Sequence, residues 1–207
     1  LDGSDTIENY GSNVSINGGV DSDRIVNNSS GANATIEGGD GNDNIDNKGS
    51  DALIAGGEGN DYISNQGINA TIDGGEDNDR IYNYRSNSSL IGGKGDDYLY
   101  NSGYYSTVEG GTGNDSINND YGNQNSIVSG TGNDTIINSG SNVTIEAGAD
   151  DDIIRNDSGA NVIFNYTAGD GNDTILGFNE TSTLQIAGGT YSTQVSGTNI
   201  IVTVGNN

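Results

Sequence analysis

Ten aspartates recur along the 207-residue chain at intervals of 18 to 21 residues, and each stands two positions before an aliphatic residue. Most of them close a glycine-rich loop, of which Gly-Gly-Glu-Gly-Asn-Asp at residues 56–61 is typical. Consecutive glycines let carbonyl oxygens turn toward one point, because a positive φ angle costs glycine no steric strain. With the carboxylate added, each loop presents several hard oxygen atoms. The aspartates are Asp5, Asp23, Asp43, Asp61, Asp79, Asp97, Asp115, Asp134, Asp152 and Asp173.

Oxygen ligands of this kind favour calcium over a transition metal, and the chain contains neither His nor Cys. One loop offers about three or four oxygens, whereas calcium takes about six to eight. Two stacked loops supply them, so we expect about seven to nine calcium ions in the gaps between the ten loops, which would offset most of the formal net charge of −24. Besides the aspartates listed above, the predicted ligands are Gly39, Gly41, Gly57, Gly59, Gly75, Asp77, Gly93, Gly95, Gly111, Gly113, Gly130, Gly132, Gly169 and Gly171.

The elements that position these loops follow from the period, because a repeat of about 20 residues indicates a solenoid. In one turn, the loop 56–61 precedes a short strand at 62–64, a second loop at 65–69 and a second strand at 70–73. Apolar–polar alternation bounded by Gly and Asn is typical of strands. Short strands stacked on identical neighbours form two parallel sheets with an aliphatic stack between them. We therefore expect an all-β solenoid of about ten 18-residue turns.

Three columns of residues support this interpretation. The first inward column is Ile7, Ile25, Ile45, Ile63, Ile81, Leu99, Ile117, Ile136, Ile154 and Ile175, and the second is Ile16, Ile36, Ile54, Ile72, Leu90, Val108, Ile127, Ile145 and then Ile163 or Phe164. The third is Asn9, Asn27, Asn47, Asn65, Asn83, Asn101, Asn119, Asn138 and Asn156, always two residues after the first aliphatic position. We expect these asparagines to form a ladder of side-chain amides, in a conformation that includes left-handed backbone.

The repeat stops after Ile175, and the sequence then changes to longer apolar–polar segments joined by glycines. We expect a calcium-binding β-roll over residues 1–176 and a C-terminal cap of antiparallel strands over residues 177–207, because the end of a solenoid exposes an apolar stack and an open sheet edge. Residues Asn165-Tyr166-Thr167 are inserted before the last loop, where the register is expected to slip. The chain starts in mid-repeat, so we expect it to be part of a longer protein that carries any targeting signal.

Composition excludes several classes of function. Thirty acidic against six basic residues argue against binding of nucleic acid or of anionic membranes. No apolar run approaches the length of a membrane span. Catalysis is not predicted, because no His, no Cys and no Ser in a nucleophile motif are present, and the few basic residues are scattered over short turns.

The acidic loop resembles the RTX repeat, the haemolysin-type nonapeptide Gly-Gly-x-Gly-x-Asp-x-aliphatic-x. The match is close at residues 38–45, 56–63, 92–99, 110–117 and 168–175, and the resemblance covers roughly residues 1–176. It implies a right-handed parallel β-roll, type I secretion, and folding on meeting extracellular calcium, with one ion between successive loops. Here every second nonapeptide is of the asparagine type, as at residues 138–145, so we expect calcium on one edge only.

Two surface features leave alternatives open beside a structural or spacer module of a secreted surface protein. Tyr62, Tyr82, Tyr98 and Tyr100 form an outward aromatic patch, which is either cross-strand stacking or a contact for a glycan or a cell-surface protein. An irregular outward column of Ser and Thr on the second strand gives ice binding as a minor alternative. The isolated chain is expected to be a monomer.

Overall fold

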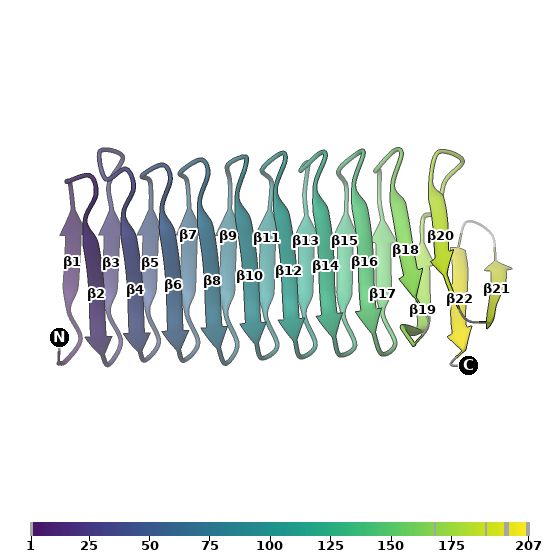
Figure 1. Cartoon of the computed structure of the whole chain (residues 1–207), viewed down its shortest axis with the longest axis horizontal. Helices are drawn as coiled ribbons and strands as arrows, with labels where there is room; N and C mark the ends of the chain where they lie inside the picture. The colour runs from purple at the N-terminus through teal and green to yellow at the C-terminus, as the bar shows by residue number, and fades with distance from the viewer. Residues whose placement is uncertain (1, 168, 189, 197–198, 206–207) are drawn as a thin grey trace.

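The computed structural model describes residues 2–167, 169–188, 190–196 and 199–205, and over these residues the chain is an elongated stack of parallel β-strands (Figure 1). The prediction of an all-β solenoid of about ten 18-residue turns is confirmed. Each turn contributes one strand to each of two sheets, and identical columns lie in register from turn to turn. No helix of the described chain is long and apolar enough to cross a membrane.

The first sheet has twelve described strands in spatial order β1 (Thr6–Asn9), β3 (Arg24–Asn27), β5 (Asn44–Asn47), β7 (Tyr62–Asn65), β9 (Arg80–Asn83), β11 (Tyr98–Asn101), β13 (Ser116–Asn119), β15 (Thr135–Asn138), β17 (Ile153–Asn156), β19 (Gly171–Leu176), β22 (Asn199–Gly205) and β21 (Thr190–Ser196). The second has ten, in order β2 (Ser15–Val20), β4 (Thr35–Asp40), β6 (Leu53–Glu58), β8 (Thr71–Glu76), β10 (Ser89–Lys94), β12 (Thr107–Thr112), β14 (Ser126–Thr131), β16 (Thr144–Ala149), β18 (Ile163–Thr167) and β20 (Thr183–Ala187).

The strands of the second sheet are longer than the sequence pattern predicts. In β6 and β8 the ladder continues through both loop glycines, so that Gly57 pairs with Gly75 and Glu58 with Glu76. Glycine has no side chain to pack, but the backbone hydrogen bonds between turns extend the strand into the acidic loop. The first half of each acidic loop is therefore part of the sheet and is held by its backbone hydrogen bonds.

The core is a dry aliphatic stack between the sheets, and both predicted inward columns are buried from the second turn onward. In the last turn Phe164, and not Ile163, takes the inward position. A third inward column was missed, because most of its members are small or polar and give a weak hydrophobic signal. It comprises Ala34, Ala52, Ala70, Ser88, Ser106, Asn125, Val143 and Val162.

The asparagine ladder is confirmed on the edge drawn at the top of Figure 1. Asn65 is buried, donates through Nδ2 to Oδ1 of Asn83 at 2.8 Å and to the carbonyl of Gly67, and accepts from Nδ2 of Asn47. The expected left-handed backbone lies elsewhere, at the next asparagine column, where Asn69 has φ 59°. The two asparagine columns therefore have different roles. The column of Asn65 forms hydrogen bonds between turns, and the column of Asn69 reverses the direction of the chain.

The C-terminal segment differs in part from the predicted cap. Strands β21 and β22 are antiparallel and close the first sheet against β19, as expected. Strand β20, however, pairs in parallel with β18, because Leu184 continues the inward column after Phe164 and packs against the core. The second sheet thus runs one strand beyond the boundary predicted at residue 176, and the division into two domains stays a prediction.

Candidate metal site

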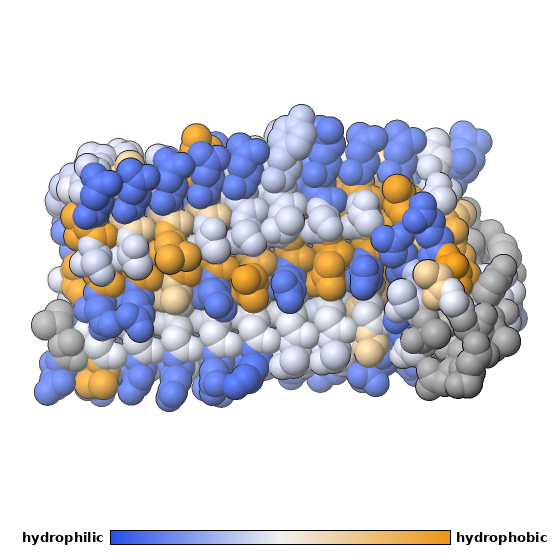
Figure 2. Space-filling model, in the orientation of Figure 1, coloured by the Kyte–Doolittle hydropathy of each residue, from blue (hydrophilic) through white to orange (hydrophobic). Residues whose placement is uncertain are grey.

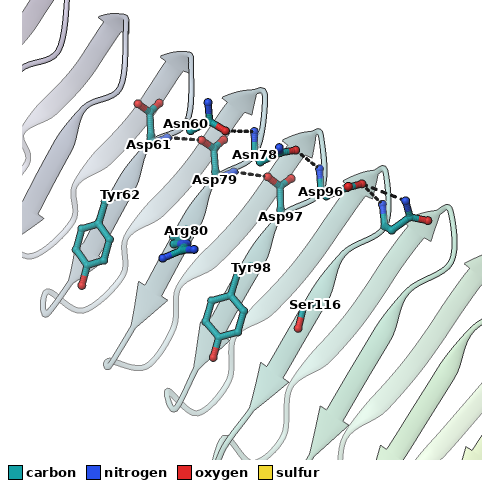
Figure 3. A pocket seen from close by; sticks show the side chains of 11 residues that line it. Asn60, Asp61, Tyr62, Asn78, Asp79, Arg80, Asp96, Asp97, Tyr98 and Ser116 are labelled. Atoms are coloured by element: carbon teal, nitrogen blue, oxygen red, sulfur yellow. Dashed lines mark hydrogen bonds between the residues drawn. The ribbon is translucent and has the colours of Figure 1, made fainter.

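The ten aspartates lie in one row along the edge drawn at the bottom of Figure 1, where each strand of the second sheet leads into a strand of the first. The backbone N–H of each aspartate donates to Oδ1 of the aspartate one turn further on, at 2.6–2.8 Å, from Asp5 through to Asp173. Three members of this ladder, Asp61, Asp79 and Asp97, are drawn in Figure 3. The hydrogen bonds fix the orientation of the nine carboxylates from Asp23 to Asp173.

The second carboxylate oxygen is left without a partner. In each aspartate from Asp23 to Asp173 the residue is at most 3% exposed, and its Oδ2 atom has no hydrogen bond from any described group. A buried charged oxygen without a partner is costly. Nine such atoms in a row, all on one edge, indicate that a further species satisfies them.

The shape of the loop shows where such a species fits. At Gly56 an added Cβ would collide with Oδ2 of Asp61 and with the carbonyl oxygen of Gly74 in the next turn. Two oxygens from successive turns therefore converge beside a glycine that has no side chain. The same arrangement recurs at Gly18, Gly38, Gly74, Gly92 and Gly110. We call each of these places a glycine cradle, and its donors, carboxylate and carbonyl oxygens, are those that calcium prefers.

The burial of these carboxylates has a strong electrostatic effect. Desolvation raises the pKa of Asp79 and Asp152 to about 8, with neighbouring aspartates adding to the shift. It raises the pKa of Asp61, Asp115 and Asp173 to about 7 and that of Asp97 to about 6. Desolvation also raises the pKa of Asp43 and Asp134 above the ordinary value. Without a cation, the row therefore disfavours its own ionised form.

The structure brings all the predicted ligand residues to this one edge. The loop glycines Gly41, Gly59, Gly95, Gly113, Gly132 and Gly171 have φ between 106° and 126°. Asp77 takes the equivalent place in its own loop with φ 73°, so the aspartate preserves the left-handed backbone. Among the described residues no three His, Cys, Asp or Glu side chains gather as a self-sufficient metal centre. Backbone carbonyls must therefore complete any coordination shell.

A second ladder on the same edge was missed by sequence reasoning. At the fifth loop position, the N–H of Asn60 donates to Oδ1 of Asn42 at 2.9 Å, and the N–H of Asn78 to Oδ1 of Asn60 at 3.3 Å. Asp96 and Asn114 continue the series. The available signal was the constant Asn or Asp before the recurrent aspartate, from Asn42 to Asn172. This ladder holds successive loops at a fixed separation.

The predicted aromatic patch lies on the outer face of the first sheet, next to the acidic edge. Tyr82 packs against Tyr62, Tyr98 and Tyr100, with ring centroids 5.3, 5.6 and 6.1 Å away. Tyr62, Arg80 and Tyr98 stand in a row on neighbouring strands and line an open hollow of about 620 Å³ beside the aspartate ladder (Figure 3). Figure 2 shows the opposite sheet face, where hydrophilic loop edges border a more hydrophobic central band.

These features define a class of protein, the parallel β-solenoids whose stacked acidic loops bind cations. The sequence matches the family model described as the RTX calcium-binding nonapeptide repeat (4 copies), over residues 47–64, 69–87, 73–103, 128–163 and 166–179. The matched segments cover about half of the chain, so the chain belongs to the RTX repeat family and is a calcium-binding repeat module. A search of curated proteins gave no significant match.

Proposed function

We propose that the chain is a calcium-stabilised structural module, a rigid spacer within a secreted surface protein. The observation that carries the proposal is the row of buried, unpartnered Oδ2 atoms on one edge only, facing glycine carbonyls of the next turn. RTX repeats are typical of secreted bacterial proteins, and extracellular modules bind calcium with dissociation constants of about 0.1–1 mM. A monomeric rod without a catalytic role accounts for the regular, uninterrupted turns.

Calcium, when bound, supplies the positive charge that the buried carboxylates lack. The protein supplies the rest: the aspartate ladder orients each carboxylate, the glycines leave space beside it, and the asparagine ladder holds the other edge without ions. We infer a one-sided ladder of about seven to nine ions, held by the ten recurrent aspartates and the loop carbonyls. Because ions bind the folded state and not the unfolded chain, each occupied site adds to stability.

The test is a calcium titration of the chelated chain, followed by far-UV circular dichroism, with magnesium as the control. We expect a cooperative gain of β signal with calcium alone, at about 0.1–1 mM as in extracellular sites. Magnesium should fail because it demands a small octahedral shell and keeps its waters. A chain that is fully β-structured in chelator, with no response to calcium, would contradict the proposal.

A second function, adhesion through the tyrosine face, is favoured by the hollow between Tyr62 and Tyr98. Aromatic rings that flank an open depression, with Asn60, Asn78 and Arg80 offering hydrogen bonds at its wall, suit an uncharged glycan. An anionic glycan would meet the charge of the neighbouring aspartates. Stacking between the tyrosines themselves, however, also satisfies the rings, so this function stands second.

A screen of the calcium-loaded chain against neutral glycans tests the adhesive function. Replacing Tyr62 and Tyr98 by Ser should abolish retention without changing the calcium-dependent β signal, since both side chains line the hollow on the outer face, away from the core. A change of Thr135 to Ser, on the same face but away from the hollow, is the matched control. If no glycan is retained, the adhesive function is wrong and the spacer role is the only proposed function that remains.

A further inference from the structure

One column of the structure changes its residue type toward the C-terminus. The glycine of each cradle is the first residue of its loop, and in register this column reads Gly18, Gly38, Gly56, Gly74, Gly92 and Gly110. The next three members are not glycines. Strand pairing places Ser129 after Gly110 and Ala147 after Ser129, and Tyr166 follows Ala147 because Asn165 pairs with Glu146.

Each of these three residues places a side chain where, in the earlier turns, two oxygen atoms approach the bare glycine backbone. In the glycine turns, an added Cβ would collide with the aspartate Oδ2 and with the next carbonyl. Ser129 and Ala147 carry that Cβ, and both are fully buried. The hydroxyl of Ser129 donates to the carbonyl oxygen of Ala147, which is the counterpart of the carbonyl that faces the cradle in earlier turns. A protein hydroxyl thus takes up an oxygen that is otherwise available to a cation.

Tyr166 fills the last position most completely. Its side chain is 1% exposed, and its hydroxyl has no hydrogen-bond partner among the described groups. Asp152, Asp170 and Asp173 are the charges that act on it, and burial raises the pKa of the tyrosine above its ordinary value, so the hydroxyl keeps its proton. The Oδ2 atoms of Asp152 and Asp173 are also unpartnered. The Tyr166 hydroxyl and these two carboxylate oxygens are therefore all buried without a hydrogen-bond partner among the described groups.

We propose that the calcium ladder is confined to the six glycine cradles of the turns from Gly18 to Asp115, and that Ser129, Ala147 and Tyr166 close it by occupying the cradles of the last three turns. This inference rests on the proposed calcium-binding function and narrows it. At the N-terminal end, the part-exposed Asp5 beside the second turn adds at most one further site. The chain then binds six or seven ions, rather than one in each of the nine gaps between its loops.

The experiment counts ions bound to the full chain, by native mass spectrometry and by elemental analysis after equilibrium dialysis against saturating calcium. The wild-type chain should hold six or seven. The double variant Ser129→Gly, Ala147→Gly reopens two cradles and should gain two ions. Tyr166→Phe keeps the ring in place and removes only the hydroxyl, so its count should equal that of the wild type. Gly11→Ala, on the asparagine edge where an added Cβ meets no cradle oxygen, is the control for glycine–alanine exchange.

The outcomes separate this inference from the function on which it rests. No bound calcium at all would overturn both. Eight or more ions on the wild-type chain, an unchanged count in the double glycine variant, or the loss of one ion in Tyr166→Phe would overturn the closure alone. If the double variant fails to fold, the ion counts of the wild type and of Tyr166→Phe still test the closure. Gly56→Ala then serves as the reverse substitution: it adds a side chain to a glycine cradle and should remove one ion.

Discussion

At the scale of single residues, each recurrent aspartate uses its two carboxylate oxygens differently. In Asp79, Oδ1 accepts the backbone N–H of Asp61 at 2.7 Å, whereas Oδ2 is buried and unpartnered. The first oxygen stabilises the fold, and the second is the oxygen that we propose binds calcium. Because the two roles lie on separate atoms, a substitution can remove the second and preserve the first.

Asp79→Asn makes this separation measurable. The asparagine keeps an oxygen for the N–H of Asp61, and its Nδ2 can donate to the carbonyl of Gly92, which faces the same cradle. We expect the calcium-free fold to gain about 1–3 kcal/mol, because a buried unpaired charge is lost. Apparent calcium affinity should fall about tenfold, which is about 1.4 kcal/mol. Urea unfolding in chelator and calcium titration measure the two effects.

The matched control for this variant is Asp51→Asn. Asp51 lies exposed on the asparagine edge with φ 57°, a conformation that asparagine tolerates equally, and the exchange removes the same formal charge. It should change calcium affinity little. If both variants weaken calcium binding equally, the effect is one of net charge and the assignment of Oδ2 of Asp79 to the ion is wrong.

At the scale of elements, the two edges of the solenoid solve one problem by different means. Each edge must provide partners for the buried polar groups where the chain passes from one sheet to the other. The asparagine edge does so with neutral amides that donate and accept in one direction, as Asn65 does between Asn47 and Asn83. The acidic edge has only acceptors at Oδ2, which is why we propose that a cation completes it.

Asn65→Ala therefore tests the edge that needs no ion. The alanine leaves Nδ2 of Asn47, Oδ1 of Asn83 and the backbone of Gly67 without their buried partners. We expect a loss of about 2–3 kcal/mol in the free energy of unfolding. Urea denaturation in saturating calcium measures it, and the exposed neighbour Gln66→Ala should stay within about 0.5 kcal/mol of the wild type. Equal losses in both variants would show that the ladder contributes nothing specific.

Most of this architecture could be predicted from the repeat period of the sequence. A spacing of 18 residues predicts parallel stacking, the two aliphatic columns and both functional edges, because register is shared by every turn. The period could not predict features that depart from it, or inward residues that lack the expected hydrophobic character. Ser88 and Ser106 are inward although polar, and Leu184 lies inward on another parallel strand, β20, after the loop pattern has ended. Tyr166 shifts into the glycine column only through an insertion, which no fixed spacing reveals.

At the scale of the whole molecule, charge and burial act together. The chain carries a formal net charge of −24, and nine of its recurrent aspartates are buried in one row. Unpaired, this charge favours an expanded chain, with a radius of gyration of about 50 Å for an unfolded polymer of this length, against about 17 Å for a compact form. Calcium removes the repulsion, but protons can remove part of it too.

We therefore expect acid to promote folding of the metal-free chain. The aspartates Asp61, Asp79 and Asp152 have pKa values of about 7 to 8 in the folded state, against an ordinary value of 3.8 in the unfolded chain. Between these values the folded state holds protons that the unfolded state has released, so its stability is greatest below pH 3.8 and is lost as the pH rises through 7 to 8. Circular dichroism and small-angle scattering of the demetallated chain should show more β structure and a smaller radius at pH 4.5 than at pH 8.5.

Calcium should reverse this dependence, because protons and calcium compete for the same carboxylates. At a fixed subsaturating calcium concentration, the folded fraction should rise with pH as the aspartates become available to the ion. The double variant Asp61→Asn, Asp79→Asn should flatten both profiles, since two of the groups with the most strongly raised pKa no longer titrate. A metal-free chain that is equally unfolded at pH 4.5 and pH 8.5 would show that neutralising the buried carboxylates is not sufficient to fold it. The ion would then act by joining carbonyls of successive turns, a role that protons cannot replace.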